Sequence, residues 1–179
     1  MAQFISLAVD PGGDIVAAGS QDTFQIFVWS LKTGRLLDVL SGHEGPVVAL
    51  SFAPGASVLA SASWDATVRT WDVFSGKGGV EALRHGHDVL ALGWRPDGRQ
   101  LASATLDGQI YLWDPVEGEL QATITGRRDI AGGRLRGDRR TADNTSSGRA
   151  FTSLAYSAGE LCGWVGGASA CLFVGDYND

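Results

Sequence analysis

Short segments in which apolar and polar residues alternate recur along most of the chain, and turn-forming residues separate them. In the segment Val47–Phe52 (VVALSF), one of the two alternating sets of side chains is apolar, as expected for a strand with a buried face. The turns Pro11-Gly12-Gly13-Asp14 and Pro96-Asp97-Gly98 contain residues that reverse a chain tightly. The sequence has 25 glycines and no long segment with the 3.6-residue period of an amphipathic helix. We therefore expect an all-β protein with almost no helix.

We expect the strands to form antiparallel units of four. In the first unit, the alternation predicts strands over Phe4–Val9, Ile15–Gly19, Phe24–Trp29 and Leu36–Leu40. The predicted units span about 4–40, 46–83 and 89–124, with a partial unit at 151–179 and an inserted loop at 126–149.

The units are copies of one repeat, because tryptophan returns at a fixed spacing. Trp29, Trp71 and Trp113 are each 42 residues apart. The second and third copies end in Trp-Asp, at Asp72 and Asp114, whereas the first has lost the aspartate. A repeat of about 40 to 45 residues with four short strands and a terminal Trp-Asp is typical of a blade of a WD-repeat β-propeller.

The first copy is one residue longer than the others between its aspartate and its tryptophan. Asp22, Asp65 and Asp107 are separated by 43 and then 42 residues, while the tryptophans keep a constant spacing. We expect the additional residue to form a β-bulge in the strand Phe24–Trp29.

The chain is too short for a typical closed ring. At 42 residues per blade, its 179 residues hold three blades and part of a fourth. Propellers close with about four to eight complete blades. We expect an open segment that either belongs to a longer protein or pairs with other copies, and we favour the longer protein. Its end blades would then expose strand edges and apolar faces.

Four polar residues of the second copy match a hydrogen-bonded chain found inside the blades of WD-repeat proteins. The resemblance implies that His43, Ser61, Asp65 and Trp71 satisfy one another in the blade interior. The same serine, histidine and aspartate could form the triad of a hydrolase. We disfavour that alternative, because the sequence has no nucleophile elbow and nothing that resembles an oxyanion hole.

The other two copies keep less of this pattern. The third copy has three of the four residues at the corresponding positions: Ser103, Asp107 and Trp113. Its histidine is ambiguous, since His87 follows a glycine, whereas His85 lies as far from the next strand as His43 does; we favour His85. The first copy has Ala18 in place of the serine and no histidine upstream, so we expect it to be the loosest of the three.

Charge is distributed unevenly along the chain. The net charge is -6, yet the segment from Arg127 to Arg149 holds seven of the 14 basic residues and only three acidic ones. The rest of the sequence therefore has 17 acidic and seven basic residues, a net charge of -10. The arginines of this segment could contact RNA phosphates or an acidic partner, serve as a nuclear import signal, or be merely solvated. They are Arg127, Arg128, Arg134, Arg136, Arg139, Arg140 and Arg149.

The sequence predicts neither a disulfide framework nor a metal site. Cys162 and Cys171 are the only cysteines and lie nine residues apart. With His85 and His87 they could offer four zinc ligands, but the two pairs belong to different blades and lack the spacing of a known zinc module. The N-terminus has no signal-peptide pattern, and no apolar run reaches the roughly 18 residues of a membrane span. We expect a soluble protein of a reducing, intracellular compartment.

Three segments resemble one group of WD-repeat proteins more closely than the superfamily as a whole. They are Ala18–Val47, Val58–Phe74, and the start of the insertion at Gly126–Asp129 followed by GRAFTSLAYSA. On these segments, residues 3 to about 158 resemble the periodic tryptophan protein 2 family. The sequence departs from the family pattern after Ala158.

This resemblance implies a piece of the first of two consecutive propellers, with no catalysis. It implies a scaffold subunit of the nucleolar small-subunit processome that acts in precursor ribosomal RNA processing and small ribosomal subunit biogenesis. The implied partners are other WD-repeat processome subunits and, directly or indirectly, precursor ribosomal RNA or a small nucleolar ribonucleoprotein. A membrane, a small-molecule substrate, a cofactor and a metal are not implied. The alternative left open is a WD-repeat adaptor of another complex, such as a substrate receptor of a ubiquitin ligase.

Overall fold

The chain folds into four antiparallel sheets that follow one another in sequence. The computed structural model describes residues 2–55, 57–74, 77–78, 82–125, 151–157, 160–165 and 168–172. Within these ranges the strands β1 to β16 form the sheets, and no residue is helical. None of the described residues therefore belongs to a helix that could span a membrane. The predicted all-β fold with open, four-stranded blades is confirmed.

The first and third sheets are meanders in which each strand pairs with the next one along the chain. The first sheet consists of β1 (Phe4–Val9), β2 (Ile15–Ser20), β3 (Ile26–Ser30) and β4 (Leu36–Leu40). The third sheet consists of β10 (Val89–Trp94), β11 (Leu101–Thr105), β12 (Gln109–Trp113) and β13 (Leu120–Thr125). Gly13 and Gly98 take positive φ in the turns after β1 and β10, where a side chain would be strained.

The second sheet has the same order but an interrupted outer strand. Its strands are β5 (Val47–Phe52), β6 (Val58–Ser63), β7 (Thr67–Asp72), β8 (Lys77–Gly78) and β9 (Leu83–Arg84). Both short strands pair with β7, since Gly78 lies opposite Trp71 and Leu83 lies opposite Val68. Together they take the place of a single fourth strand. The fourth sheet has three strands, β14 (Ser153–Ser157), β15 (Glu160–Val165) and β16 (Ala168–Leu172).

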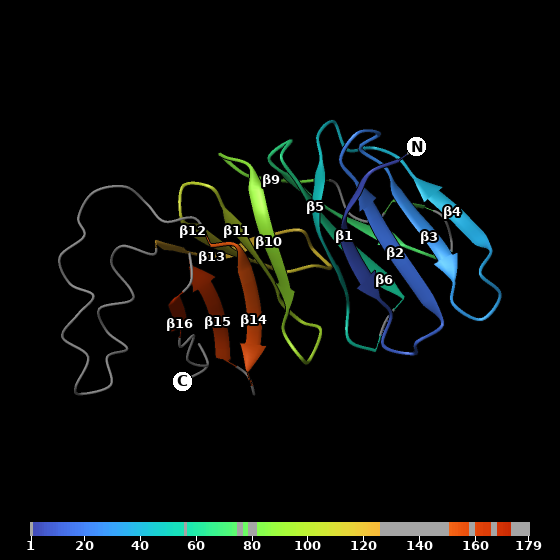
Figure 1. Ribbon diagram of the computed structural model, residues 1–179. Helices are drawn as coiled ribbons and strands as arrows, with labels where there is room; N and C mark the ends of the chain where they lie inside the picture. Colours follow the sequence, from blue (N-terminus) through green and yellow to red (C-terminus); the bar gives the residue numbers. More distant parts are fainter. Residues whose placement is uncertain are drawn as a thin grey trace.

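The sheets are arranged side by side like the blades of a fan (Figure 1). The first strand of each sheet contacts the first strand of the next, in the order β1, β5, β10 and β14. The first and fourth sheets lie at opposite ends of the fan, so the ring is not closed (Figure 1).

The additional residue of the first sheet lies in a turn, so the predicted bulge is wrong. β2 and β3 pair in unbroken register as far as Gly19 and Ile26. Six residues separate this pair, whereas five separate Ala62 and Val68, the matching pair of β6 and β7. Asp22 accepts hydrogen bonds within the longer turn, which therefore holds the extra residue without disturbing the ladder. A register shift does occur between β3 and β4, but the same shift recurs between β12 and β13.

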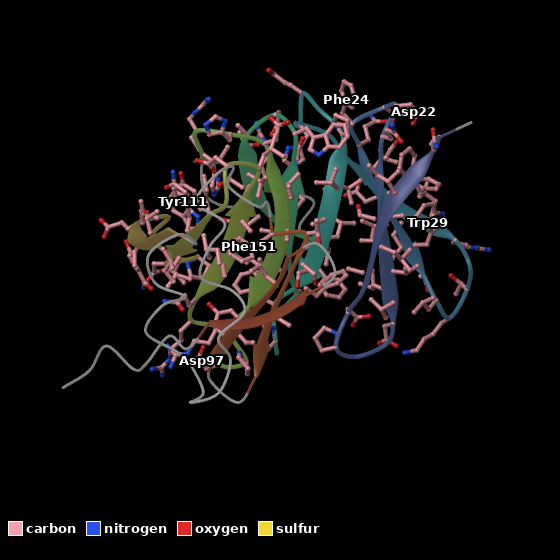
Figure 2. The ribbon with its side chains drawn as sticks, turned by 60° about the vertical axis from the view of Figure 1, so that its left-hand side comes forward. Asp22, Phe24, Trp29, Asp97, Tyr111 and Phe151 are labelled. Carbon is pink, nitrogen blue, oxygen red and sulfur yellow. The ribbon has the colours of Figure 1, made fainter. Side chains whose placement is uncertain are left out.

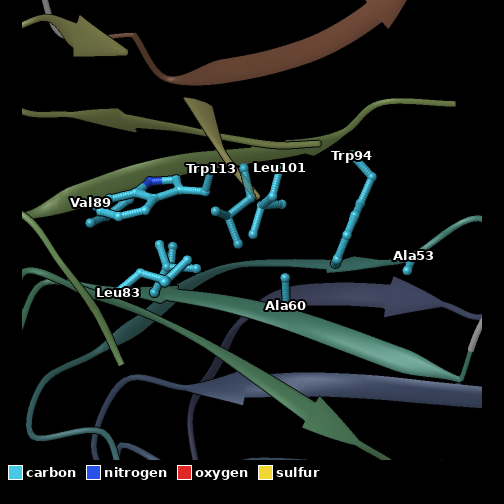
Figure 3. Packing of buried hydrophobic residues seen from close by; sticks show 10 residues of the cluster. Ala53, Ala60, Leu83, Val89, Trp94, Leu101 and Trp113 are labelled. Carbon is cyan, nitrogen blue, oxygen red and sulfur yellow. The ribbon is translucent and has the colours of Figure 1, made fainter. Parts of the chain in front are cut away.

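A separate hydrophobic cluster fills each gap between neighbouring sheets. The cluster between the first and second sheets contains Ile15, Ala17, Ile26, Val28, Leu40, Val47, Phe52, Leu59 and Trp71. The cluster between the second and third, drawn in Figure 3, contains Ala53, Ala60, Ala62, Val68, Leu83, Val89, Leu92, Trp94, Leu101 and Trp113. The cluster between the third and fourth contains Ala91, Ala102, Ala104, Ile110, Leu112, Phe151 and Leu154. In the first two gaps, the earlier sheet contributes mainly small or aliphatic side chains and the later sheet contributes the tryptophan.

Candidate functional site

The second sheet brings all four predicted polar residues together in one hydrogen-bonded chain. The Trp71 indole Nε1–H donates to Ser61 Oγ over 2.9 Å. Ser61 Oγ lies 2.7 Å from His43 Nε2, and His43 Nδ1 lies 2.8 Å from Asp65 Oδ2. The chain is fully satisfied when the serine hydroxyl donates to Nε2 and the histidine donates from Nδ1 to the carboxylate. It joins β6, β7 and the segment before β5.

This chain has the order of a Ser-His-Asp triad but not its accessibility. Ser61 is 0% exposed and His43 is 8% exposed. The serine oxygen also accepts the indole N–H of Trp71, which fixes its orientation toward the blade interior. A nucleophile has to reach a substrate carbonyl beside an oxyanion hole, and this hydroxyl is enclosed by protein. The geometry supports a structural role for the four residues.

Asp65 is held as a carboxylate by hydrogen bonds. Burial raises its pKa, but donors from His43, Thr67 and the backbone N–H of Glu44 outweigh burial and place the pKa well below the ordinary value of 3.8. Thr67 was not predicted from the sequence. Its Oγ1–H donates to Asp65 Oδ1 over 2.6 Å, and its backbone N–H donates to the same oxygen over 2.9 Å. A threonine two residues after the aspartate is the signal that could have identified it.

The third sheet has a shorter chain that ends on the backbone. Trp113 Nε1–H donates to Ser103 Oγ over 3.0 Å, and Ser103 Oγ lies 2.7 Å from His85 Nε2. The other ring nitrogen of His85, Nδ1, lies 3.1 Å from the carbonyl oxygen of Leu83. His85 is thus the histidine that joins serine and tryptophan, and it also binds the third sheet to β9 of the second. Burial lowers the pKa of His85 to about 4.

Asp107 is separate from this chain. Its carboxylate accepts hydrogen bonds from Thr105 Oγ1 over 2.5 Å and from Gln109 Nε2 over 2.8 Å. His87, which is more than half exposed, lies 3.9 Å from the same carboxylate. Burial raises the pKa of Asp107, but these hydrogen bonds and the nearby His87 have the larger effect, so the pKa lies below its ordinary value of 3.8. The two candidate histidines therefore divide the role: His85 contacts the serine and His87 lies near the aspartate.

The first sheet has an aromatic cluster in place of the polar chain. Ala18 occupies the serine position, and Phe4, Phe27 and Trp29 contact one another. The Phe27 and Trp29 rings stack with centroids 5.9 Å apart, and Phe4 meets Trp29 edge-on at 5.5 Å. Figure 2 shows Trp29 on the side of the sheet that faces away from the rest of the molecule.

Comparison with known sequences agrees with the assignment of these sheets as WD-repeat blades. Residues 34–72 and 80–114 match the family "WD domain, G-beta repeat". The chain is 64% identical over 156 residues to periodic tryptophan protein 2 of Arabidopsis thaliana, a match that covers 87% of this chain and 17% of that protein. It is 52% identical over 173 residues to the periodic tryptophan protein 2 homolog of Schizosaccharomyces pombe, covering 96% of this chain and 20% of that protein.

This chain belongs to the periodic tryptophan protein 2 family of WD-repeat proteins. It spans about a fifth of the length of these two relatives. Among solved structures, a chain of the mitotic checkpoint complex superposes with a TM-score of 0.73 at 22% identity, over 92% of this chain and 45% of that chain. At that identity the likeness concerns the fold alone.

The remaining predicted residues fall in two groups. The arginines Arg127, Arg128, Arg134, Arg136, Arg139, Arg140 and Arg149 lie outside the described residues. Of the weighed zinc ligands, His85 uses both ring nitrogens in hydrogen bonds and is not available to a metal. Cys162 and Cys171 are paired in the backbone register of β15 and β16. Within the described ranges, no group of three or more histidine, cysteine, aspartate or glutamate side chains is placed to hold a metal ion.

Proposed function

We propose that this chain is part of a non-catalytic scaffold subunit of the nucleolar small-subunit processome, which acts in precursor ribosomal RNA processing and small ribosomal subunit biogenesis. The observation that carries the proposal is its identity of 64% to a periodic tryptophan protein 2. The family resemblance implies this role, and we propose it for the whole protein that contains this chain.

The internal chemistry is consistent with a scaffold. The polar side chains that could suggest catalysis, Ser61 and His43, are buried and used to hold strands together. The blades expose their turns and outer strands, and such rigid surfaces suit the binding of several proteins at once. We propose that the partners are other WD-repeat subunits and precursor ribosomal RNA or a small nucleolar ribonucleoprotein.

The arginine-rich segment 126–149 is the proposed place of contact with RNA or with an acidic partner. It concentrates half of the basic residues of an otherwise acidic chain. A basic segment binds polyanions by releasing counterions, so its contribution should weaken as salt increases.

Removal of the protein tests the proposed function. In cells that encode this chain, depletion of the full-length protein should cause unprocessed precursor of the small-subunit ribosomal RNA to accumulate and the mature species to decline. Northern blotting of both species measures the effect, and large-subunit RNA serves as the internal control. Normal processing after complete depletion would refute the proposal and leave an adaptor of another complex as the better candidate.

A further inference from the structure

A small cavity lies between the first and second sheets, at the lower edge of the fan where β1 and β5 end (Figure 1). Its lining includes Asp10 and Ile15 from the first sheet and its turns, and Phe52, Gly55, Ser57 and Phe74 from the second. Its volume of about 240 Å³ is below the roughly 300 to 1,000 Å³ of pockets that hold drug-sized ligands. A space of this size suits one large side chain better than a cofactor.

The cavity exists because the second sheet has small residues where the third has larger ones. The turns after β5 and β10 have the same length, and Phe52 and Trp94 precede them at equivalent positions of the strand pairing. Counted from there, the second sheet has Phe52, Gly55 and Ser57 where the third has Trp94, Asp97 and Arg99. Beside the first sheet, these smaller side chains leave space.

The aromatic ring at this position also differs in chemistry from one gap to the next. Trp94 donates its Nε1–H across its gap to a carbonyl of β5 over 3.0 Å. Tyr156, the equivalent residue of the fourth sheet, donates its hydroxyl to Gln100 Oε1 over 2.9 Å. Phe52 has no donor, and Ile15, which takes the position of Gln100, has no acceptor in its side chain. The floor of the cavity is therefore apolar.

The rim of the cavity combines an exposed aromatic ring with negative charge. Phe74 is 73% exposed. Asp10 accepts hydrogen bonds from the backbone N–H groups of Gly12, Asp14 and Ile15, which fix its carboxylate beside the cavity. Lys32 pairs with Asp14 over 2.7 Å, whereas no described side chain forms an ion pair with Asp10. A cation on an occupant would complement this rim.

We propose that the cavity is a docking site for an extended segment of a partner protein. The segment inserts one leucine or phenylalanine side chain and places a neighbouring lysine or arginine against Asp10. The apolar floor selects the inserted side chain, Phe74 packs against it, and the carboxylate selects the neighbouring cation. This protein contact is independent of the RNA contact proposed above for residues 126–149.

Three variants of the full-length protein change the cavity or serve as its control. Phe52→Trp introduces the ring that the third sheet has at this position and fills the space. Phe74→Ala removes the exposed ring of the rim, at a position where a smaller side chain does not disturb the core. Val116→Ala is the matched control, because Val116 follows Trp113 as Phe74 follows Trp71 and is 76% exposed. An unchanged thermal midpoint verifies that each variant folds.

A phage-displayed library of short random peptides, selected on the full-length protein, is the probe. We expect the enriched peptides to share a leucine or phenylalanine next to a lysine or arginine. Fluorescence anisotropy of a labelled synthetic copy should show binding weakened by about tenfold or more in Phe52→Trp and Phe74→Ala and unchanged in Val116→Ala. Failure to enrich such peptides, or equal binding to the filled and open cavities, would overturn the proposal.

Two further measurements test the charge and the kind of occupant. Asp10→Asn keeps an oxygen for the N–H groups of Asp14 and Ile15 but removes the charge, so it should weaken peptide binding and flatten its salt dependence. Binding that is unaffected by this substitution would refute the role of Asp10. Sedimentation of the full-length protein tests self-association. If it forms a dimer that Phe52→Trp abolishes, the occupant is a second copy and the proposal is wrong.

Discussion

At the scale of single residues, Ser61 is the central member of the hydrogen-bonded chain in the second sheet. Its hydroxyl is the acceptor for Trp71 and contacts His43, and it is fully buried. Ser61→Ala would leave two buried polar groups unpaired, so we expect the free energy of unfolding to fall by about 2 to 4 kcal/mol. Chemical denaturation of the full-length protein measures the loss. Ser57→Ala, at an exposed position of the turn between β5 and β6, should change stability little, and equal effects of the two substitutions would contradict the structural role of Ser61.

His85 makes stability depend on pH. Its pKa is about 4 in the folded protein because of burial, below the ordinary value of 6.5 that we expect after unfolding. The unfolded chain therefore takes up a proton first as the pH falls. The contribution of neutral His85 to the free energy of unfolding is complete above pH 6.5 and decreases between pH 6.5 and 4, by as much as about 3 kcal/mol.

A comparison of two histidine variants isolates this effect. His85→Gln should flatten the fall in unfolding free energy between pH 6.5 and 4, whereas His87→Gln, at an exposed ring, should preserve it. Asp65 contributes in a different range: its lowered pKa adds stability that is lost only as the pH falls below about 3.8. An unchanged slope in the His85 variant would show that His85 does not cause the dependence.

At the scale of the strands, the first and second sheets approach so closely at Gly19 that no space is left for a side chain. A Cβ added there would lie 2.7 Å from the carbonyl oxygen and 2.8 Å from Cγ1 of Val47, and would also collide with Ser6 Oγ. Gly19→Ala should therefore push β5 from the first sheet and lower the unfolding free energy by about 1 to 3 kcal/mol. Gly86→Ala is the matched control, because nothing lies within 4 Å of its added Cβ. Equal stability of the two variants would show that the sheets can separate without loss.

Many elements were predictable because apolar and polar residues alternate along several strands and because glycine and proline mark several turns. β1 and β4 begin and end where the alternation places them. The position of the additional residue of the first copy was not predictable from spacing alone, since a bulge and a longer turn give the same residue count. In the third sheet, Gln109 takes the position that Thr67 has in the second sheet. The longer side chain of Gln109 binds the Asp107 carboxylate, and the separation of Asp107 from His85 depends on this contact. Spacing identifies equivalent positions, but these contacts depend on the length of side chains.

At the scale of the whole molecule, the polar residues inside the blades hold the strands together. We propose that the surfaces of the blades bind partners and that the protein containing this chain is a scaffold on precursor ribosomal RNA. Ultraviolet cross-linking of the tagged full-length protein in cells, followed by purification, RNA sequencing and mass spectrometry, tests the claim most directly. We predict strong enrichment of precursor ribosomal RNA together with other WD-repeat subunits. Recovery of neither, from a protein that is folded and nucleolar, would contradict it.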